Sequence, residues 1–296
     1  MESWQSPHGR KLPDMGRRTL VMGILNVTPD SFSDGGRLDS VQAILDRAGQ
    51  MVADGADLLD IGGESTRPGA SSVSASEELA RVLPAIAALR QAFPDLPLSV
   101  DTYKAPVADA AVTAGADLIN DVWGFMHDLS AAERIEWRDG WGEISPMARV
   151  AAQRNCPAIL MHNRLDRNYG DFLADVVRDL QASRAMARAA GLTSAQIWLD
   201  PGFGFVKTIA QNLEVIRRLQ DIVALGHPVV VGTSRKSTLG AVLGTTVEDR
   251  LEGSGASAVW AIQQGCHMIR VHDVREMTRF ARMADAIKAG LSFTAP

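Results

Sequence analysis

Polar side chains stand at the end of each of eight short apolar runs in the sequence. Three of them, Asp101, Asn120 and Asp200, offer carboxylate and amide oxygens. A buried carboxylate without a partner is costly to remove from water, so a ligand with N–H donors is expected to meet these oxygens. A planar, nitrogen-rich heterocycle presents such donors. The three residues therefore predict a heterocycle-binding pole, while for Asp60 a ligand contact and a structural turn cap stay equally open.

Cationic side chains follow other runs and predict a second, basic pole. Arginine binds phosphate in a bidentate manner, and lysine and protonated histidine add positive charge. Asn26, at the end of the first run, has an amide oxygen that suits a hard cation. A heterocycle that carries a phosphate or pyrophosphate would span both poles. The cationic set is Arg67, Arg235, Lys236, Arg270 and His272.

These residues need a scaffold that brings eight segment ends to one place. Apolar runs of strand length alternate with longer helical patterns, which predicts parallel strands joined by right-handed crossovers. Glycines that end helices lead directly into strands, as at Gly55 and Gly115. The expected strands are Leu20–Leu25, Leu58–Ile61, Pro97–Val100, Leu118–Ile119, Ala158–Met161, Ile197–Leu199, Val229–Val231 and Met268–Val271. The expected helices include Val41–Ala53, Glu77–Phe93, Pro106–Ala114, Phe172–Ala190, Leu213–Ala224, Gly255–Gln264 and Val274–Ala289.

Eight βα units at fairly even spacing favour a single (β/α)8 TIM barrel, with an active site at the C-terminal ends of the strands. An open doubly wound sheet is the alternative, but no Gly-rich dinucleotide fingerprint follows the first strand. Residues 1–18 are expected to form an N-terminal extension and residues 19–296 the barrel. The segment from Trp123 to Pro146 carries Trp137 and Trp141 and breaks the rhythm. A surface excursion and a functional lid both remain open for it.

The composition limits the class of protein. The chain has 296 residues and a net charge of −5, with both signs interspersed. This balance argues against a nucleic-acid groove or a membrane-binding face. The N-terminus lacks the apolar core of a signal peptide, and no apolar run approaches the ~20 residues of a membrane span. Cys156 and Cys266 both lie in apolar segments and are interpreted as buried free thiols, which predicts a cytoplasmic protein.

Seven motifs in order resemble the dihydropteroate synthase family, from about Thr19 to Ala289. They are NVTPDSFSDGG at Asn26–Gly36, GESTRPGA at Gly63–Ala70, SVDT at Ser99–Thr102, IND at Ile119–Asp121, DPGFGF at Asp200–Phe205, SRKS at Ser234–Ser237 and RVHDV at Arg270–Val274. Val206 stands where the family commonly has glycine. The resemblance implies a Mg²⁺-dependent homodimer of folate biosynthesis. Such an enzyme joins 6-hydroxymethyl-7,8-dihydropterin diphosphate to 4-aminobenzoate, giving 7,8-dihydropteroate and pyrophosphate.

The resemblance also implies roles for individual residues. Asp34, Arg67, Asp101 and Lys236 are the expected catalytic residues, and Asp34 and Phe32 lie in a mobile first loop that closes over the reacting centre. By the same resemblance the pterin is bound by Asp101, Asn120, Asp200 and Lys236. The diphosphate is bound by Arg67, Arg270 and His272, and Asn26 supports Mg²⁺ and the diphosphate. The aminobenzoate site is shaped by Thr66, Pro68, Phe205, Lys236 and Ser237. We assign no role to His162, and expect Lys207 to support the rim of the pterin pocket.

The chemistry needs no protein nucleophile, because diphosphate leaves once its charge is met by Mg²⁺, arginine and histidine. Departure leaves a delocalised pterin-methyl cation that the aminobenzoate amine attacks, a dissociative substitution. A methyltetrahydrofolate-dependent methyltransferase is the nearest alternative, since it would share the pterin-binding strand ends without the diphosphate set. A Schiff-base aldolase that uses Lys236 and a non-catalytic binding paralogue rank further behind.

Overall fold

The computed structural model describes residues 5–27, 37–65 and 72–292. Eight parallel strands follow one another around a barrel in the order β6-β5-β4-β3-β2-β1-β8-β7. A bridge between Leu199 and Val229 joins the two outer strands, β6 and β7, and so closes the ring. The (β/α)8 TIM barrel is therefore confirmed. The strands are β1 (Leu20–Asn26), β2 (Leu58–Gly62), β3 (Leu98–Asp101), β4 (Leu118–Asp121), β5 (Ala158–Met161), β6 (Ile197–Asp200), β7 (Val230–Val231) and β8 (Met268–Val271).

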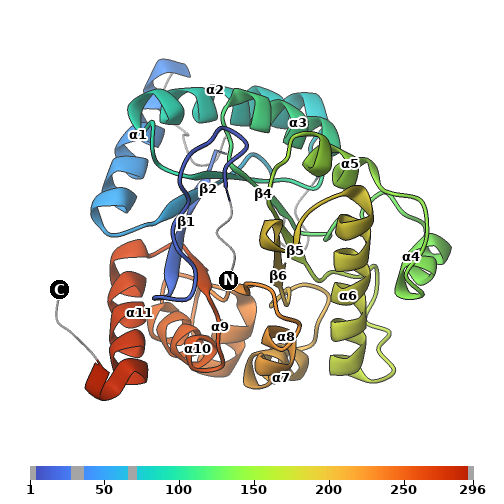
Figure 1. Ribbon diagram of the computed structural model, residues 1–296. Helices are drawn as coiled ribbons and strands as arrows, with labels where there is room; N and C mark the ends of the chain where they lie inside the picture. Colours follow the sequence, from blue (N-terminus) through green and yellow to red (C-terminus); the bar gives the residue numbers. More distant parts are fainter. Residues whose placement is uncertain (1–4, 28–36, 66–71, 293–296) are drawn as a thin grey trace.

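Helices surround the barrel (Figure 1). They are α1 (Arg37–Ala53), α2 (Ala75–Ala92), α3 (Ala105–Ala114), α4 (Ala131–Arg138), α5 (Pro146–Gln153), α6 (Phe172–Ala190), α7 (Ile209–Arg217), α8 (Gln220–Val223), α9 (Ser237–Leu243), α10 (Leu251–Gln263) and α11 (Val274–Ala289). Two short 3₁₀ helices, η2 (Ser194–Gln196) and η3 (Gly290–Ser292), complete the set in the described ranges.

The expected helix over residues 213–224 is wrong in its bounds. The chain there forms α7 and α8, and α7 begins at Ile209. Its start is set by Thr208, whose side chain accepts a hydrogen bond from the backbone N–H of Gln211, at 3.2 Å, in a capping box. A capping box satisfies helix-end donors that the apolar spacing alone does not reveal.

The barrel interior follows from the period of two along each strand. Alternate residues such as Leu20, Met22 and Trp198 point inward and form a small buried cluster at the N-terminal end of the barrel. Their neighbours, such as Val21 and Leu199, belong to the larger core between the sheet and the helices. The same alternation turns the polar residues at the C-terminal strand ends into the barrel.

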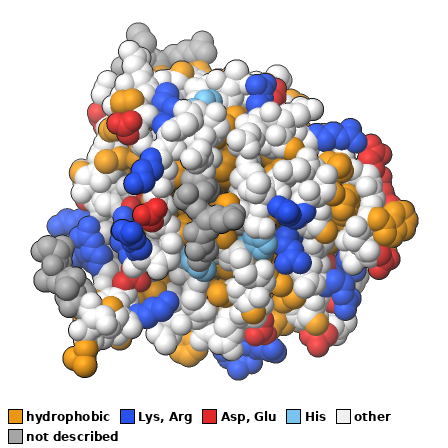
Figure 2. Space-filling view, viewed as in Figure 1, with side chains coloured by type: hydrophobic (Ala, Val, Ile, Leu, Met, Phe, Trp, Pro, Cys, Tyr) orange, Lys and Arg blue, Asp and Glu red, His pale blue; other side chains and the backbone are white. Residues whose placement is uncertain are grey.

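The N-terminal segment closes the other end of the barrel. Leu12 is buried in the small apolar cluster with Leu20 and Met22. In Figure 1 this dark blue segment crosses in front of the barrel. On the same face, basic and acidic side chains are interspersed (Figure 2), in keeping with the balanced composition.

Asp117, which is fully buried, ties this segment to the barrel. Its carboxylate accepts hydrogen bonds from Ser6 Oγ at 2.5 Å, Arg10 Nε at 2.9 Å and Arg90 Nη2 at 2.7 Å. The backbone N–H of Leu98 adds a fourth at 3.0 Å. A buried carboxylate with this many donors is satisfied in the folded state.

The segment from Trp123 to Pro146 contains α4 and is packed by Trp137. Trp137 is buried, and its Nε1 donates to the carbonyl oxygen of Glu143 at 3.0 Å. Trp141 is 60% exposed. Of these two tryptophans, only Trp137 therefore packs the segment.

We predict that Asp117→Ala lowers the free energy of unfolding by about 3 kcal/mol, because it strips two arginines of their buried partner. Urea unfolding measures the change. Arg154→Ala is the control, since Arg154 pairs with Asp109 across 2.6 Å on the surface, with both side chains more than 40% exposed. An exposed pair contributes about 0–1 kcal/mol. A loss for Asp117→Ala no larger than that of the control would contradict the prediction.

Candidate active site

Arg270 links two carboxylates inside the barrel. Its Nε donates to Asp60 Oδ2 at 2.6 Å, and its Nη2 donates to Asp101 Oδ2 at 2.5 Å. Asn120 donates its Nδ2 to the same oxygen of Asp60, at 2.9 Å. The strand register explains the meeting, because Asp60 faces Ser99 and Gly62 faces Asp101 across β2 and β3. Strands β2, β3 and β4, together with β8 on the other side of β1, thus contribute one connected group, Asp60, Asp101, Asn120 and Arg270, named here the inner cluster.

The inner cluster has acceptors to spare. Asp60 Oδ1 and Asp101 Oδ1 are buried, and neither has a hydrogen-bond partner among the described residues. Buried polar atoms of native proteins are nearly always satisfied. These two oxygens are therefore suited to N–H donors of a ligand.

The charges in the inner cluster do not balance, since one guanidinium meets two carboxylates. Burial raises the pKa of Asp101 to about 7, against the attraction of Arg270, and the repulsion of Asp60 adds to the rise. Burial disfavours the charge of Arg270, but Asp60 and Asp101 together outweigh it and raise the pKa of Arg270. The site therefore favours a ligand that brings hydrogen-bond donors.

Lys236 and Asp200 lie next to the inner cluster. Lys236 donates its Nζ to the carbonyl oxygen of Phe203, and the same nitrogen lies 4.7 Å from the centre of the Phe205 ring. Burial lowers the pKa of Lys236 to about 8; the carboxylate of Asp200 opposes this change and Arg270 adds to it. Burial likewise raises the pKa of Asp200, against the pull of Lys236. A cation, a carboxylate and an aromatic ring therefore share one wall.

The loop after β6 can follow its path only with an unusual backbone. A Cβ on Gly202 would lie 2.0 Å from the carbonyl oxygen of His162, and one on Gly204 would lie 2.7 Å from Lys236 Cδ. Val206 has a φ of +42°, in the left-handed region that a β-branched residue rarely adopts. Valine thus keeps a backbone conformation that favours glycine.

The basic residues fall into different surroundings. Nδ1 of His272 forms a hydrogen bond with Ser234 Oγ at 3.0 Å. The backbone N–H of His272 donates to the same oxygen at 3.1 Å. Arg235 forms an ion pair with Asp273, with Nε donating to Oδ2 at 2.9 Å. Arg235 is therefore engaged by a carboxylate and does not add a free charge to the basic pole. Ser237 is the first residue of α9.

Asn26 is exposed at the end of β1. Its Oδ1 lies 3.6 Å from the point that a Cβ on Gly62 would occupy, and Asp101 Oδ2 lies 3.7 Å from the same point. The amide oxygen thus flanks Gly62 together with the inner cluster. Among the described residues, no group of three or more His, Cys, Asp or Glu side chains could hold a metal ion.

Five of the expected site residues lie outside the described residues. They are Phe32, Asp34, Thr66, Arg67 and Pro68. The structure brings Asp101, Asn120, Asp200, Lys236 and Arg270 together with Phe205 at the C-terminal strand ends. Asp60, which sequence reasoning left undecided, belongs to the inner cluster. Its inward position in the alternation with Gly62 was the available signal.

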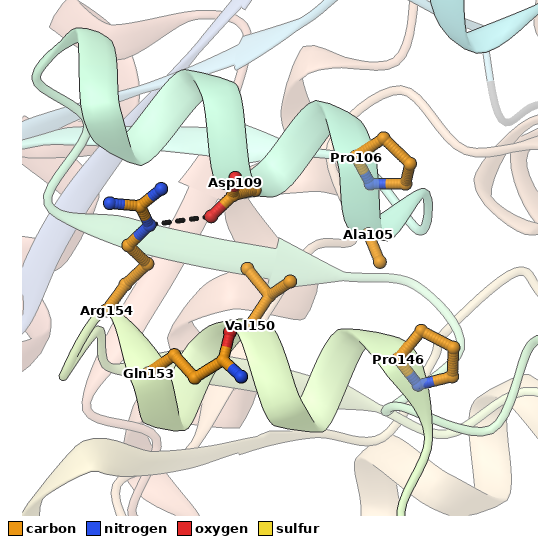
Figure 3. A pocket seen from close by; sticks show the side chains of 7 residues that line it. All are labelled: Ala105, Pro106, Asp109, Pro146, Val150, Gln153 and Arg154. Carbon is orange, nitrogen blue, oxygen red and sulfur yellow. Dashed lines mark hydrogen bonds and ion pairs between the residues drawn. The ribbon is translucent and has the colours of Figure 1, made fainter.

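A groove of about 460 Å³ lies on the outside of the barrel between α3 and α5 (Figure 3). Prolines 106 and 146 stand at one end, and the ion pair of Asp109 with Arg154 stands at the other. None of the residues that line it was expected in the active site. The chemistry is therefore to be sought at the barrel mouth.

Comparison with known proteins decides the family. Residues 22–272 match the family described as pterin binding enzyme. A dihydropteroate synthase from Bacillus subtilis is 50% identical over 270 residues, which cover 91% of this chain and 89% of the relative. The chain belongs to the dihydropteroate synthase family of pterin-binding enzymes. It is accordingly a transferase, and the resemblance noted in the motifs is confirmed.

Solved structures agree. A dihydropteroate synthase from Clostridium difficile, determined in the presence of pteroic acid, superposes with a TM-score of 0.85 at 44% identity, covering 93% of this chain and 99% of its own. The enzyme from Xanthomonas albilineans with 4-aminobenzoic acid gives a TM-score of 0.86 at 40% identity, covering 98% and 100%. Across the described part of the chain, no helix is long and apolar enough to cross a membrane.

Proposed function

We propose that this chain condenses 6-hydroxymethyl-7,8-dihydropterin diphosphate with 4-aminobenzoate, giving 7,8-dihydropteroate and pyrophosphate in folate biosynthesis. The observation that carries the proposal is the pair of unpartnered buried oxygens in the inner cluster, Asp60 Oδ1 and Asp101 Oδ1. A pterin ring presents N–H donors in a plane and would satisfy them. The pteroic acid and 4-aminobenzoate complexes of the two relatives support the same pair of ligands.

Each pole then has a task. Asp101, Asn120 and Asp200 bind and orient the pterin, and Lys236 places its charge beside Asp200 and its stem against Phe205. Arg67, Arg270 and His272 take the diphosphate. Thr66, Pro68, Phe205 and Ser237 shape the aminobenzoate site, and Asp34 in the first loop covers the reacting centre. No cysteine is needed as a nucleophile: Cys156 and Cys266 are buried, and burial raises the pKa of the Cys266 thiol to about 12.

The oxygen of Asn26 at the rim fits a Mg²⁺ ion that is held mainly by the substrate. A hard cation that is held mainly by substrate phosphates and water needs only one or two protein oxygens, and the exposed amide oxygen of Asn26 is one. Bound there, Mg²⁺ would offset the charge of the departing diphosphate. The protein contributes position, electrostatics and the exclusion of water, and the pterin C–O bond breaks before the amine attacks.

A homodimer and a cytoplasmic location complete the proposal. Large apolar side chains lie exposed on the outer helices, including Trp260 at 50%, Met283 at 63% and Ile287 at 66%. Exposed apolar groups on α10 and α11 support an interface between two copies. The two free, buried cysteines suit a reducing compartment. Sedimentation of the purified protein at twice the chain mass would support the dimer, and a single chain mass would exclude it.

The direct test combines the purified protein with both substrates and Mg²⁺. We expect pyrophosphate and dihydropteroate in equal amounts. We also expect Asn26→Ala to raise the Mg²⁺ concentration for half-maximal rate by about tenfold, because one protein oxygen is lost from the site. Asn168→Ala, which removes an amide from the loop after β5, should leave that concentration unchanged. If the wild type forms neither product, the proposed function fails; an unchanged Mg²⁺ requirement in Asn26→Ala removes only the role of Asn26.

The pH profile tests Lys236. Its pKa of about 8 means that the ammonium is present below pH 8 and is lost as the pH rises through that value. We therefore expect kcat/KM for the pterin substrate to fall above about pH 8, by up to tenfold per pH unit, as the enzyme loses this charge. Lys236→Arg stays charged because the guanidinium does not deprotonate in this range. Its profile should be lower but should lack the fall above pH 8 that the loss of the Lys236 charge causes, and the same fall in this variant would contradict the assignment.

A further inference from the structure

A second buried polar group lies behind the loop that follows β6. Lys207 is 4% exposed, and its Nζ donates to the carbonyl oxygens of Gly202 at 3.0 Å and Phe205 at 3.2 Å. The same nitrogen lies 2.8 Å from Nδ1 of His162, which is also buried. On the far side of the ring, His162 Nε2 lies 3.2 Å from Asp179 Oδ2. Asp179, His162 and Lys207 are named here the anchor.

The contacts of the anchor fix its protons. The ionised carboxylate of Asp179 only accepts, so His162 Nε2 carries a proton and donates to it. In the neutral imidazole Nδ1 then carries no proton and accepts from Lys207. The neutral form agrees with the surroundings: burial lowers the pKa of His162 to about 3, Lys207 adds to this change and Asp179 opposes it.

Asp179 is held in place from the outside of the barrel. Arg164 donates Nε to its Oδ2 at 2.6 Å, and Arg138 donates Nε to its Oδ1 at 2.7 Å. These bonds and the one from His162 outweigh the effect of burial and keep the pKa of Asp179 below its usual range. The orientation of His162 is therefore set by a carboxylate that two arginines hold in place.

Lys207 in turn fixes the loop at two points. Gly202 and Phe205 lie on either side of Gly204, and the Tyr169 hydroxyl adds a bond to the carbonyl oxygen of Val206 at 3.1 Å. The loop carries Phe205, and Asp200, the last residue of β6, accepts from the backbone N–H of Gly202 in the loop at 2.6 Å. It also supplies the Phe203 carbonyl oxygen that receives Lys236. A shift of the loop would thus move three groups of the pterin wall together.

The charge of Lys207 also acts on the pterin wall, through Asp200. Burial lowers its pKa to about 7, and the nearby carboxylate of Asp200 opposes that change. Lys236, Arg164 and Asp179 are the other charged groups that face it. Lys207 therefore supports the ionised form of Asp200 without lying in the inner cluster.

We propose that Lys207 is a positioning residue for the pterin site. Neutral His162 orients Lys207, because its Nδ1 accepts a hydrogen bond from Lys207 while its Nε2 donates one to Asp179. The anchor sets the position of Asp200 and Phe205 and does not touch the substrate. This inference rests on the proposed function, since the loop matters only if its wall receives a pterin.

Two substitutions of His162 separate the anchor from simple support of the fold. Asparagine places its amide oxygen near the position of Nδ1, so His162→Asn keeps the acceptor for Lys207 and loses Asp179. Glutamine reaches the position of Nε2, so His162→Gln keeps the donor to Asp179 and leaves Lys207 with one unmet N–H. Both variants keep a neutral polar amide, and thermal unfolding measures how much stability each loses.

The readouts are KM for dihydropterin diphosphate, kcat, and the Kd of 6-hydroxymethylpterin by calorimetry. We expect His162→Gln and Lys207→Met to raise KM and Kd about tenfold, because a buried donor or acceptor is left unmet. His162→Asn should stay within about threefold of the wild type, the usual cost of one replaced hydrogen bond. Arg138→Ala is the control and should leave both constants within about twofold, since Arg164 still holds Asp179.

The outcomes are distinct. A larger rise in KM and Kd for His162→Gln than for His162→Asn, at similar thermal stability, supports the anchor. Equal values in the two variants, or values that follow the loss of stability, overturn it while the proposed function stands. A wild type that makes no dihydropteroate and binds no 6-hydroxymethylpterin overturns both.

Discussion

The guanidinium of Arg270 lies between the carboxylates of Asp60 and Asp101 inside a barrel that is apolar below them. One positive charge for two buried negative ones is a costly arrangement, and a protein selected for stability alone would do better with packed apolar groups. The two unpartnered oxygens show what the arrangement lacks. A ligand that brings N–H donors into the barrel completes it, so the imbalance is part of how the site recognises a heterocycle.

The neighbouring wall depends on the same principle of incomplete compensation. Lys236 lies beside Asp200, but burial lowers its pKa and the nearby charge of Arg270 lowers it further. Its stem lies so close to the loop after β6 that residue 204 must be glycine. The position of Lys236 therefore depends on a loop whose backbone includes Val206 at a positive φ. Such a loop keeps its shape only where the surroundings determine it, and the bonds from Lys207 and Tyr169 do so.

The sequence predicts much of this architecture, because strands buried on both faces read as apolar runs and polar residues stand out at their ends. It predicts less where the signal is local or distant. Helices α5 and α9 have only 8 and 7 residues and were not expected. The contact of Lys207 with His162 was not visible, because the two residues are 45 positions apart and meet only in the folded barrel. Asp60 stayed undecided for a related reason: Arg270 is 210 positions away and reaches it only in the folded barrel.

Arg138 connects the segment between Trp123 and Pro146 to the rest of the barrel. From α4, its guanidinium reaches Asp179 on α6, and from there the contacts pass through His162 to Lys207 and the loop of Asp200. Along this path the charges alternate in sign, with a neutral imidazole between the carboxylate and the ammonium. A protonated His162 would face the ammonium of Lys207 at close range, and a missing Asp179 would leave two arginines together. Each buried charge from Asp179 to the loop after β6 therefore depends on its neighbours, while Arg138, at the surface end, shares Asp179 with Arg164.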